Sequence, residues 1–134
     1  MAASGKTVRV DILRSQLGRV RGLGAARAGS GTWWAERLTS IALVPLTLWF
    51  IASAVSLEGT TRAGMIAWLH APLPLVLMLC LIVATFRHMD LGLRVVVEDY
   101  VHHEAARMSL LLLIRGICVV AALLCIISAL RLGL

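Results

Sequence analysis

The stretch Leu38–Leu57, LTSIALVPLTLWFIASAVSL, contains 20 residues and no charged side chain. At about 1.5 Å per residue, a helix of this length covers about 30 Å, the thickness of the hydrocarbon core of a bilayer. Pro45 lies inside the stretch, and a proline is tolerated within a span where neighbouring helices satisfy the freed carbonyl group. The stretch therefore predicts a transmembrane helix.

Two more apolar stretches follow this one. Met108–Leu130 is interrupted only by Arg115, whose charge either reaches the interface, which we favour, or faces a polar partner in the bundle. The other stretch follows the sequence His-Ala-Pro-Leu-Pro, which favours a helix start because proline suits the first turn. From Pro72 the helical pattern continues to about Val97. A helix of that length, about 39 Å, must tilt or protrude from the membrane.

The sequence thus predicts an all-α membrane protein with three transmembrane helices, over about residues 33–57, 70–98 and 106–131. Residues 1–32 are predicted to form a basic N-terminal arm, and residues 33–134 a membrane anchor domain. The arm lacks the apolar stretch of a secretory signal, and its Arg-rich, acid-poor composition also resembles a mitochondrial presequence. Docking of the arm on a partner or on lipid headgroups is the simpler interpretation.

Composition supports a membrane protein. Of the 134 residues 60% are hydrophobic and 15% charged, and the mean hydropathy is +0.90. The net charge of +6 comes mainly from the lysine and arginines before the first span, so it indicates topology rather than nucleic-acid binding. The positive-inside rule places the N-terminus and the second loop in the cytoplasm. So little soluble mass remains that we expect no catalytic activity from the isolated chain.

The three cysteines, Cys80, Cys118 and Cys125, all lie inside apolar stretches. An odd number of cysteines, with none in a loop, argues against a disulfide framework. Buried cysteine as a small apolar side chain is the ordinary case, and we predict no metal site for the pair Cys118 and Cys125.

The second helix carries the most informative polar residues, in the string HMDLGLRVVVEDY from His88 to Tyr100. At 100° per residue, His88, Gly92 and Asp99 lie close to one helix face, with His88 and Asp99 about 16 Å apart. The imidazole and the neighbouring glycine suit a flat macrocycle whose iron is held by His88. The alternatives are an interhelical hydrogen bond for His88 and close helix packing at Gly92.

Other polar residues have two interpretations each. Tyr100 is either an aromatic anchor at the headgroups or a phenol that donates a hydrogen bond to a ligand carbonyl, and Asp99 is either a solvated helix end or a group that orients the phenol. Arg37 either flanks the first span or serves as a counter-ion for a propionate or a headgroup. His102 and His103 are expected in a solvated loop.

The charged residues within the second helix need partners. Asp90 and Arg94 are spaced for an i,i+4 ion pair, and we predict that they form one. Arg87 is expected to face either a propionate or the membrane interface. Ionisable residues within a span are a functional hypothesis by default.

Together these residues resemble the smaller haem-bearing membrane anchor, the D subunit, of bacterial and mitochondrial succinate dehydrogenase. That family has an arginine at the start of helix one, a haem-ligating histidine in helix two, a glycine four residues later and Asp-Tyr eleven residues after the histidine. The matching positions are Arg37, His88, Gly92, Asp99 and Tyr100. The resemblance covers most of the chain except its first thirty residues.

The resemblance implies half of a heterodimeric haem-binding helical bundle in a bacterial inner membrane, with the mitochondrial inner membrane as the alternative. It implies haem b, whose iron takes one axial ligand from His88, a propionate paired with Arg37, and ubiquinone bound by Tyr100 beside Asp99. It also implies three partners: a second membrane anchor of the cytochrome b556 type, an iron–sulfur subunit and a flavoprotein that carries FAD. Electrons from succinate then reach quinone through the iron–sulfur subunit.

Two other functions remain open from the residues. An anchor of fumarate reductase would run the reverse reaction, and a non-redox membrane scaffold or assembly protein would use His88 for packing. A small transporter is disfavoured because three spans offer no inverted repeat.

Overall fold

The computed structural model describes residues 17, 20 and 29–134. Within them lie the helices α2 (Gly29–Ser56), α3 (Arg62–Leu69), α4 (Pro72–Tyr100) and α5 (Glu104–Gly133), and these described residues contain no strand. Helices α2, α4 and α5 are long and apolar enough to cross a membrane. The prediction of an all-α protein with three transmembrane helices is therefore confirmed.

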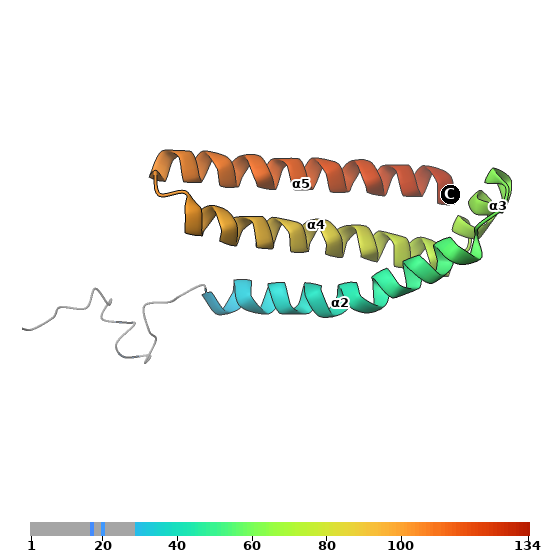
Figure 1. Cartoon of the computed structure of the whole chain (residues 1–134), viewed down its shortest axis with the longest axis horizontal. Coiled ribbons are helices and arrows are strands. Elements are labelled where there is room, and N and C mark those ends of the chain that lie inside the picture. Colours follow the sequence, from blue (N-terminus) through green and yellow to red (C-terminus); the bar gives the residue numbers. More distant parts are fainter. Residues whose placement is uncertain (1–16, 18–19, 21–28) are drawn as a thin grey trace, which may run out of the picture.

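The three long helices lie side by side with α4 in the middle (Figure 1). Helix α4 packs against both α2 and α5, whereas the backbones of α2 and α5 do not approach each other closely within the described part of the chain. The bundle is thus an open layer rather than a closed cylinder. Helix α2 contains Pro45, and its second half curves in Figure 1, as expected where proline removes a backbone hydrogen bond.

The ends of α4 follow from local chemistry. Ala71 precedes the helix in an extended conformation, and proline occupies its first turn, where the missing N–H group has no intrahelical partner to lose. Val101 ends the helix with φ −100° and ψ 101°. Helix α4 therefore spans 72–100, two residues later at each end than the predicted 70–98.

Helix α3 is an element that the sequence did not lead us to expect. Thr61 caps it by accepting a hydrogen bond from the Gly64 amide at 3.3 Å, and His70 closes it. His70 therefore belongs to the end of α3 and not to the long second helix. The indole rings of Trp49 and Trp68 stack with centroids 5.8 Å apart, which connects α3 to α2.

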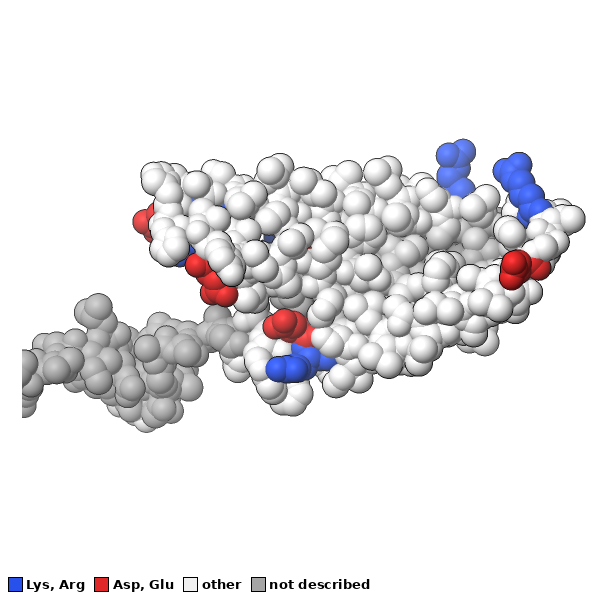
Figure 2. All heavy atoms as spheres, viewed as in Figure 1, with Lys and Arg blue, Asp and Glu red and all other residues white. Residues whose placement is uncertain are grey.

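The described chain buries few of its own side chains. The buried apolar residues are Leu75, Leu91, Val97, Cys118 and Ala129. In Figure 2 most of the charged side chains visible on one face lie near the ends of the helices, and the middle of that face is largely uncharged. Many large apolar side chains of the described residues are exposed. Such large apolar surfaces mark contact with lipid or another protein, as expected for a subunit of a membrane complex.

The predicted arm, residues 1–32, lies mostly outside the described residues. Helix α2 begins at Gly29 and α5 extends from 104 to 133, compared with predicted limits of 33–57 and 106–131. Each of these two helices therefore differs from its predicted limits by a few residues, which is the usual uncertainty where helix ends are read from sequence.

Candidate haem and quinone site

His88 lies near the middle of α4 and faces α2. Its ring Nδ1 is 3.1 Å from the hydroxyl oxygen of Thr39, and both side chains are partly buried. This is an interhelical hydrogen bond, which was one of the two interpretations of His88. Because it engages only one ring nitrogen, it is also compatible with metal ligation through Nε2.

Gly92 lies one turn further along α4 from His88. A Cβ atom added there would have no atom within 4 Å, apart from the backbone of its own helix turn and its chain neighbours. Packing between helices of this chain therefore does not require glycine at this position. The space beside Gly92 is open to something outside the chain, such as a partner helix or a flat cofactor.

Asp99 and Tyr100 form the last residues of α4. Both are exposed, and 80% of the Tyr100 surface is accessible. Asp99 shares the helix face of His88, whereas Tyr100 follows one position further round. A ligand at Tyr100 would need walls from outside this chain, because such an exposed phenol does not enclose a site.

Arg37 does not lie with His88. Its guanidinium carbon is 5.5 Å from the ring centroid of Trp33, a cation–π contact at the start of α2. Two residues further on, Thr39 faces α4, and positions two apart are about 200° apart on a helix. The Arg37 side chain therefore leaves α2 on the face away from α4. The pairing of Arg37 with a propionate stays a prediction.

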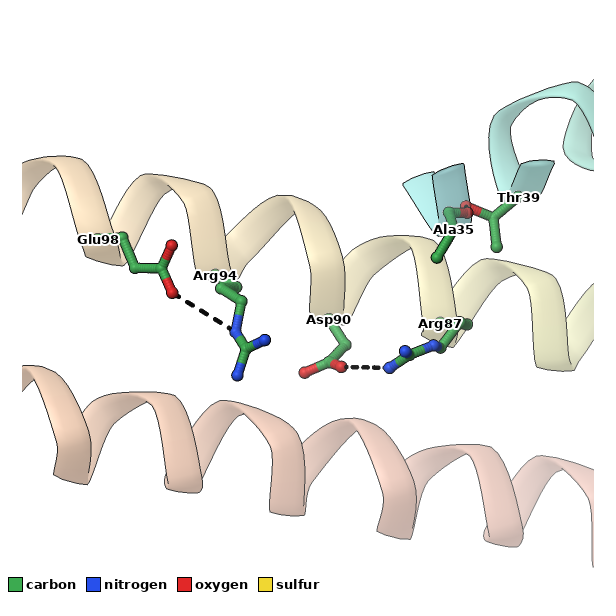
Figure 3. Close-up of polar contacts among 6 residues, drawn as sticks. All are labelled: Ala35, Thr39, Arg87, Asp90, Arg94 and Glu98. Carbon is green, nitrogen blue, oxygen red and sulfur yellow. Dashed lines mark hydrogen bonds and ion pairs between the residues drawn. The ribbon is translucent and has the colours of Figure 1, made fainter. Parts of the chain in front are cut away.

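The predicted ion pair between Asp90 and Arg94 is wrong. Arg87 Nη1 donates to the Asp90 carboxylate at 3.0 Å, and Arg94 Nε lies 3.6 Å from Glu98 Oε1. Figure 3 shows both pairs along one side of α4. The short aspartate side chain reaches back three residues, and the longer glutamate reaches back four. Arg87 thus has a carboxylate partner within its own helix, while its side chain stays 46% exposed, and a contact with a propionate or the interface stays a prediction.

Two cavities accompany these charged residues. One of about 430 Å³ lies between α2 and α4 and is lined by Trp33, Glu36, Arg94 and Glu98 among others. Another, of about 210 Å³, lies between α4 and α5, and its lining includes Arg87, Asp90 and Arg115. Arg115 is exposed and lines the same cavity as Asp90, so both interpretations of Arg115 stay open.

Sequence reasoning missed several polar contacts. Thr39 gives no local signal because its partner His88 is 49 residues away. His103 was expected to be a solvated loop residue, but it caps α5, where its Nδ1 accepts a hydrogen bond from the Ala106 amide at 3.4 Å. His102 is exposed, and its ring lies 3.2 Å from the Tyr100 carbonyl oxygen. Histidine is not among the residues preferred as helix N-caps, so the sequence carried no clear signal for this cap.

Fold and site together define a multi-pass helical membrane subunit with a histidine and an open glycine surface on its central helix. Residues 12–125 match the sequence model of a family described as the succinate dehydrogenase/fumarate reductase transmembrane subunit. The chain belongs to this family and is a succinate dehydrogenase/fumarate reductase membrane anchor subunit. The identification as a succinate dehydrogenase anchor, first made from the motif, is thereby confirmed.

Named relatives agree with the family. The chain is 28% identical over 108 residues to the succinate dehydrogenase hydrophobic membrane anchor subunit of Rickettsia conorii, covering 80% of this chain and 86% of the relative. For the protein of the same name from Rickettsia felis the identity is 31% over 97 residues, with 72% and 80% covered. For Paracoccus denitrificans it is 25% over 113 residues, with 84% and 88% covered. No solved structure matches the chain.

Proposed function

We propose that this chain is the anchor of a succinate:quinone oxidoreductase that binds haem b and forms part of the site where ubiquinone is reduced. The observation that carries the proposal is the pairing of His88 with the open surface beside Gly92 on the middle helix. The relatives named above are succinate dehydrogenase anchors, which favours succinate oxidation over the fumarate reductase direction.

The residues fit a haem in their chemistry. His88 has one ring nitrogen engaged by Thr39, which leaves the other for iron, and the glycine surface leaves room for a planar group. Haem b, when bound, supplies a one-electron carrier within the membrane. His88 would hold its iron, together with a histidine from the second anchor, the one of the cytochrome b556 type.

Quinone reduction to quinol takes two electrons and two protons. Electrons would come from succinate through the FAD of the flavoprotein and the clusters of the iron–sulfur subunit. Tyr100 would donate a hydrogen bond to a quinone carbonyl, whose negative charge grows as electrons arrive, so a fixed donor favours the reduced form. Asp99 would orient the phenol or pass on a proton from water, because both residues lie exposed at the end of α4.

The positive-inside rule supports a cytoplasmic N-terminus and a cytoplasmic α4–α5 loop. The end of α4 that carries Tyr100 would then face the compartment where the soluble subunits dock. Because the relatives are bacterial, we propose the bacterial inner membrane as the location of the complex.

The deciding experiment is purification of the complex in mild detergent, followed by identification of the co-purifying proteins and a reduced-minus-oxidised spectrum. We expect a flavoprotein, an iron–sulfur protein and a second anchor, with a low-spin haem spectrum. His88→Ala should alter or remove that spectrum while succinate oxidation by artificial acceptors continues. An unchanged spectrum in His88→Ala would show that His88 is not the ligand, and a complex without reducible haem would favour the non-redox scaffold.

A further inference from the structure

We propose that Thr39 is a positioning residue for the haem ligand: its hydroxyl oxygen accepts a hydrogen bond from Nδ1–H of His88 and thereby fixes the tautomer that presents the Nε2 lone pair to iron. The proposal rests on the proposed function, in which His88 is an axial ligand. Thr39 itself touches neither the iron nor the quinone, so it acts only through the imidazole ring.

The first step concerns the hydroxyl proton of Thr39. The hydroxyl oxygen lies 2.9 Å from the Ala35 carbonyl oxygen and 3.0 Å from the Glu36 carbonyl oxygen. A threonine within a helix commonly donates its proton to a carbonyl one turn earlier. A hydroxyl has one proton and two acceptor lone pairs. Once the proton is directed at the helix backbone, the oxygen is left as an acceptor.

The second step concerns the histidine ring. Nδ1 of His88 lies 3.1 Å from the same oxygen, so one of the two atoms must supply a proton. With the hydroxyl proton engaged on α2, that proton comes from Nδ1. A neutral imidazole carries a single N–H group, so Nε2 keeps its lone pair.

The opposite tautomer is less favourable here. It would place the proton on Nε2, where no hydrogen bond is formed to any other described residue. An N–H group without an acceptor in apolar surroundings loses free energy of hydration without compensation. A bare lone pair at Nε2 is easier to accommodate, and it is the form that binds a metal.

This arrangement has the form of an outer-shell hydrogen bond to a metal ligand. Such bonds orient the ring and raise its basicity, and their loss typically costs about 10–100-fold in metal affinity. The same contact joins α2 to α4, so the orientation of the ligand depends on how the two helices pack. A more basic imidazole favours ferric over ferrous iron, so removing the bond should raise the midpoint potential.

The chain offers a matched control for the test. Thr47 lies on the same helix, and its hydroxyl also donates to the preceding turn, at 2.6 Å from the Leu43 carbonyl oxygen. The Thr47 hydroxyl is exposed, and its hydrogen bonds among the described residues go to the Leu43 and Val44 carbonyl oxygens of its own helix. Thr39→Val and Thr47→Val remove the same hydroxyl with the same replacement, and only the first removes a contact with His88.

The experiment uses the assembled complex and measures two properties of the haem: its midpoint potential by redox titration, and its rate of transfer to a haem-free acceptor protein. We expect Thr39→Val to raise the potential and speed haem loss about tenfold, Thr39→Ser to restore both, and Thr47→Val to match the wild type. Wild-type haem properties in Thr39→Val would overturn the proposal.

A second variant tests the proposal if the complex that carries Thr39→Val does not assemble. Thr39→Cys keeps a similar size but offers a weaker acceptor, so it should give a smaller shift of potential in the same direction. An unshifted potential in Thr39→Cys overturns the proposal as well. A failure of the proposed function would give a different result, because the haem spectrum of His88→Ala would then match that of the wild type.

Discussion

The carboxylate of Asp90 accepts a hydrogen bond from Arg87 three residues earlier, at 3.0 Å, within a helix that is long and apolar enough to cross the membrane. Asp90 lies about 15 Å from the Tyr100 end of α4 at the helical rise per residue, so we expect it to lie within the membrane. Arg115 lines the same cavity from α5. The Asp90 carboxylate therefore serves as the counter-charge of Arg87, the residue with which it forms its ion pair.

We predict that Asp90→Asn destabilises the complex. Asparagine carries no charge, so Arg87 would lose its carboxylate partner. An arginine without a counter-charge at the centre of a span costs ~3 kcal/mol of free energy. The thermal midpoint of the detergent-solubilised complex should fall by several degrees, and the amount of assembled complex in membranes should drop. Differential scanning fluorimetry and native gels measure these two effects.

Glu98→Gln is the matched control for Asp90→Asn. The Arg94–Glu98 pair is longer, 3.6 Å, and lies nearer the helix end, with half of the Glu98 side chain exposed. An exposed pair contributes about 0–1 kcal/mol, so Glu98→Gln should leave the thermal midpoint nearly unchanged. Equal effects of the two variants would contradict the assignment of Asp90 to the membrane interior.

Tyr100→Phe tests the quinone site in this chain, because it keeps the aromatic ring and removes only the donor. Loss of one fixed donor costs about 2.7–4 kcal/mol in water-excluded sites, and this exposed end of α4 should show less. We expect quinone reduction to fall about tenfold or more, equivalent to roughly 1.4 kcal/mol. Haem content and succinate oxidation with an artificial acceptor should stay near wild type in the same membranes. A wild-type rate of quinone reduction would leave Tyr100 as an interfacial anchor.

Gly92→Val tests whether the open surface beside His88 receives the haem. Apart from its chain neighbours and the backbone of its own helix turn, no described residue has an atom within 4 Å of a Cβ there, so the helical content of the chain should be unchanged. A haem seated on that surface would be displaced, and haem content per complex should fall severalfold. Gly116→Val is the control, because its Cβ position on α5 is equally open. Full haem content in both variants would mean that the surface is covered by something else.

The chain expressed without its partner anchor should not retain haem. It offers one histidine suited to axial ligation, and His70 lies at the end of α3 beyond the start of α4. Loss of the second ligand and of the covering helices should lower haem content to a small fraction of one per chain. Spectra of the chain with and without the second anchor measure this, and a stoichiometric low-spin haem in the isolated chain would contradict it.

The sequence predicted the features that depend on neighbouring residues. Span lengths followed from apolar runs, because the bilayer sets the number of helical residues that must be free of charge. The relation of His88, Gly92 and Asp99 on one face followed from the helical repeat alone. The family was identified for the same reason, since its motif lies mostly within one helix, and the family comparison bears the identification out.

Local reasoning was less successful where side-chain reach or a short element decided the outcome. The i,i+4 spacing suggested Asp90 with Arg94, but Asp90 is paired with Arg87 and Arg94 with Glu98. Helix α3 has eight residues, and so short a helix depends on packing against its neighbours more than on its own sequence.

By itself the sequence therefore determined the three spans, the order of the polar residues along α4 and membership of the anchor family. The tertiary structure decided that α4 lies between α2 and α5, that the Gly92 surface is left open, and that Thr39 meets His88. The physical reason is the range of the interactions. A helix and its faces are set by residues within a few turns, whereas a hydrogen bond across 49 residues exists only once two helices have packed side by side.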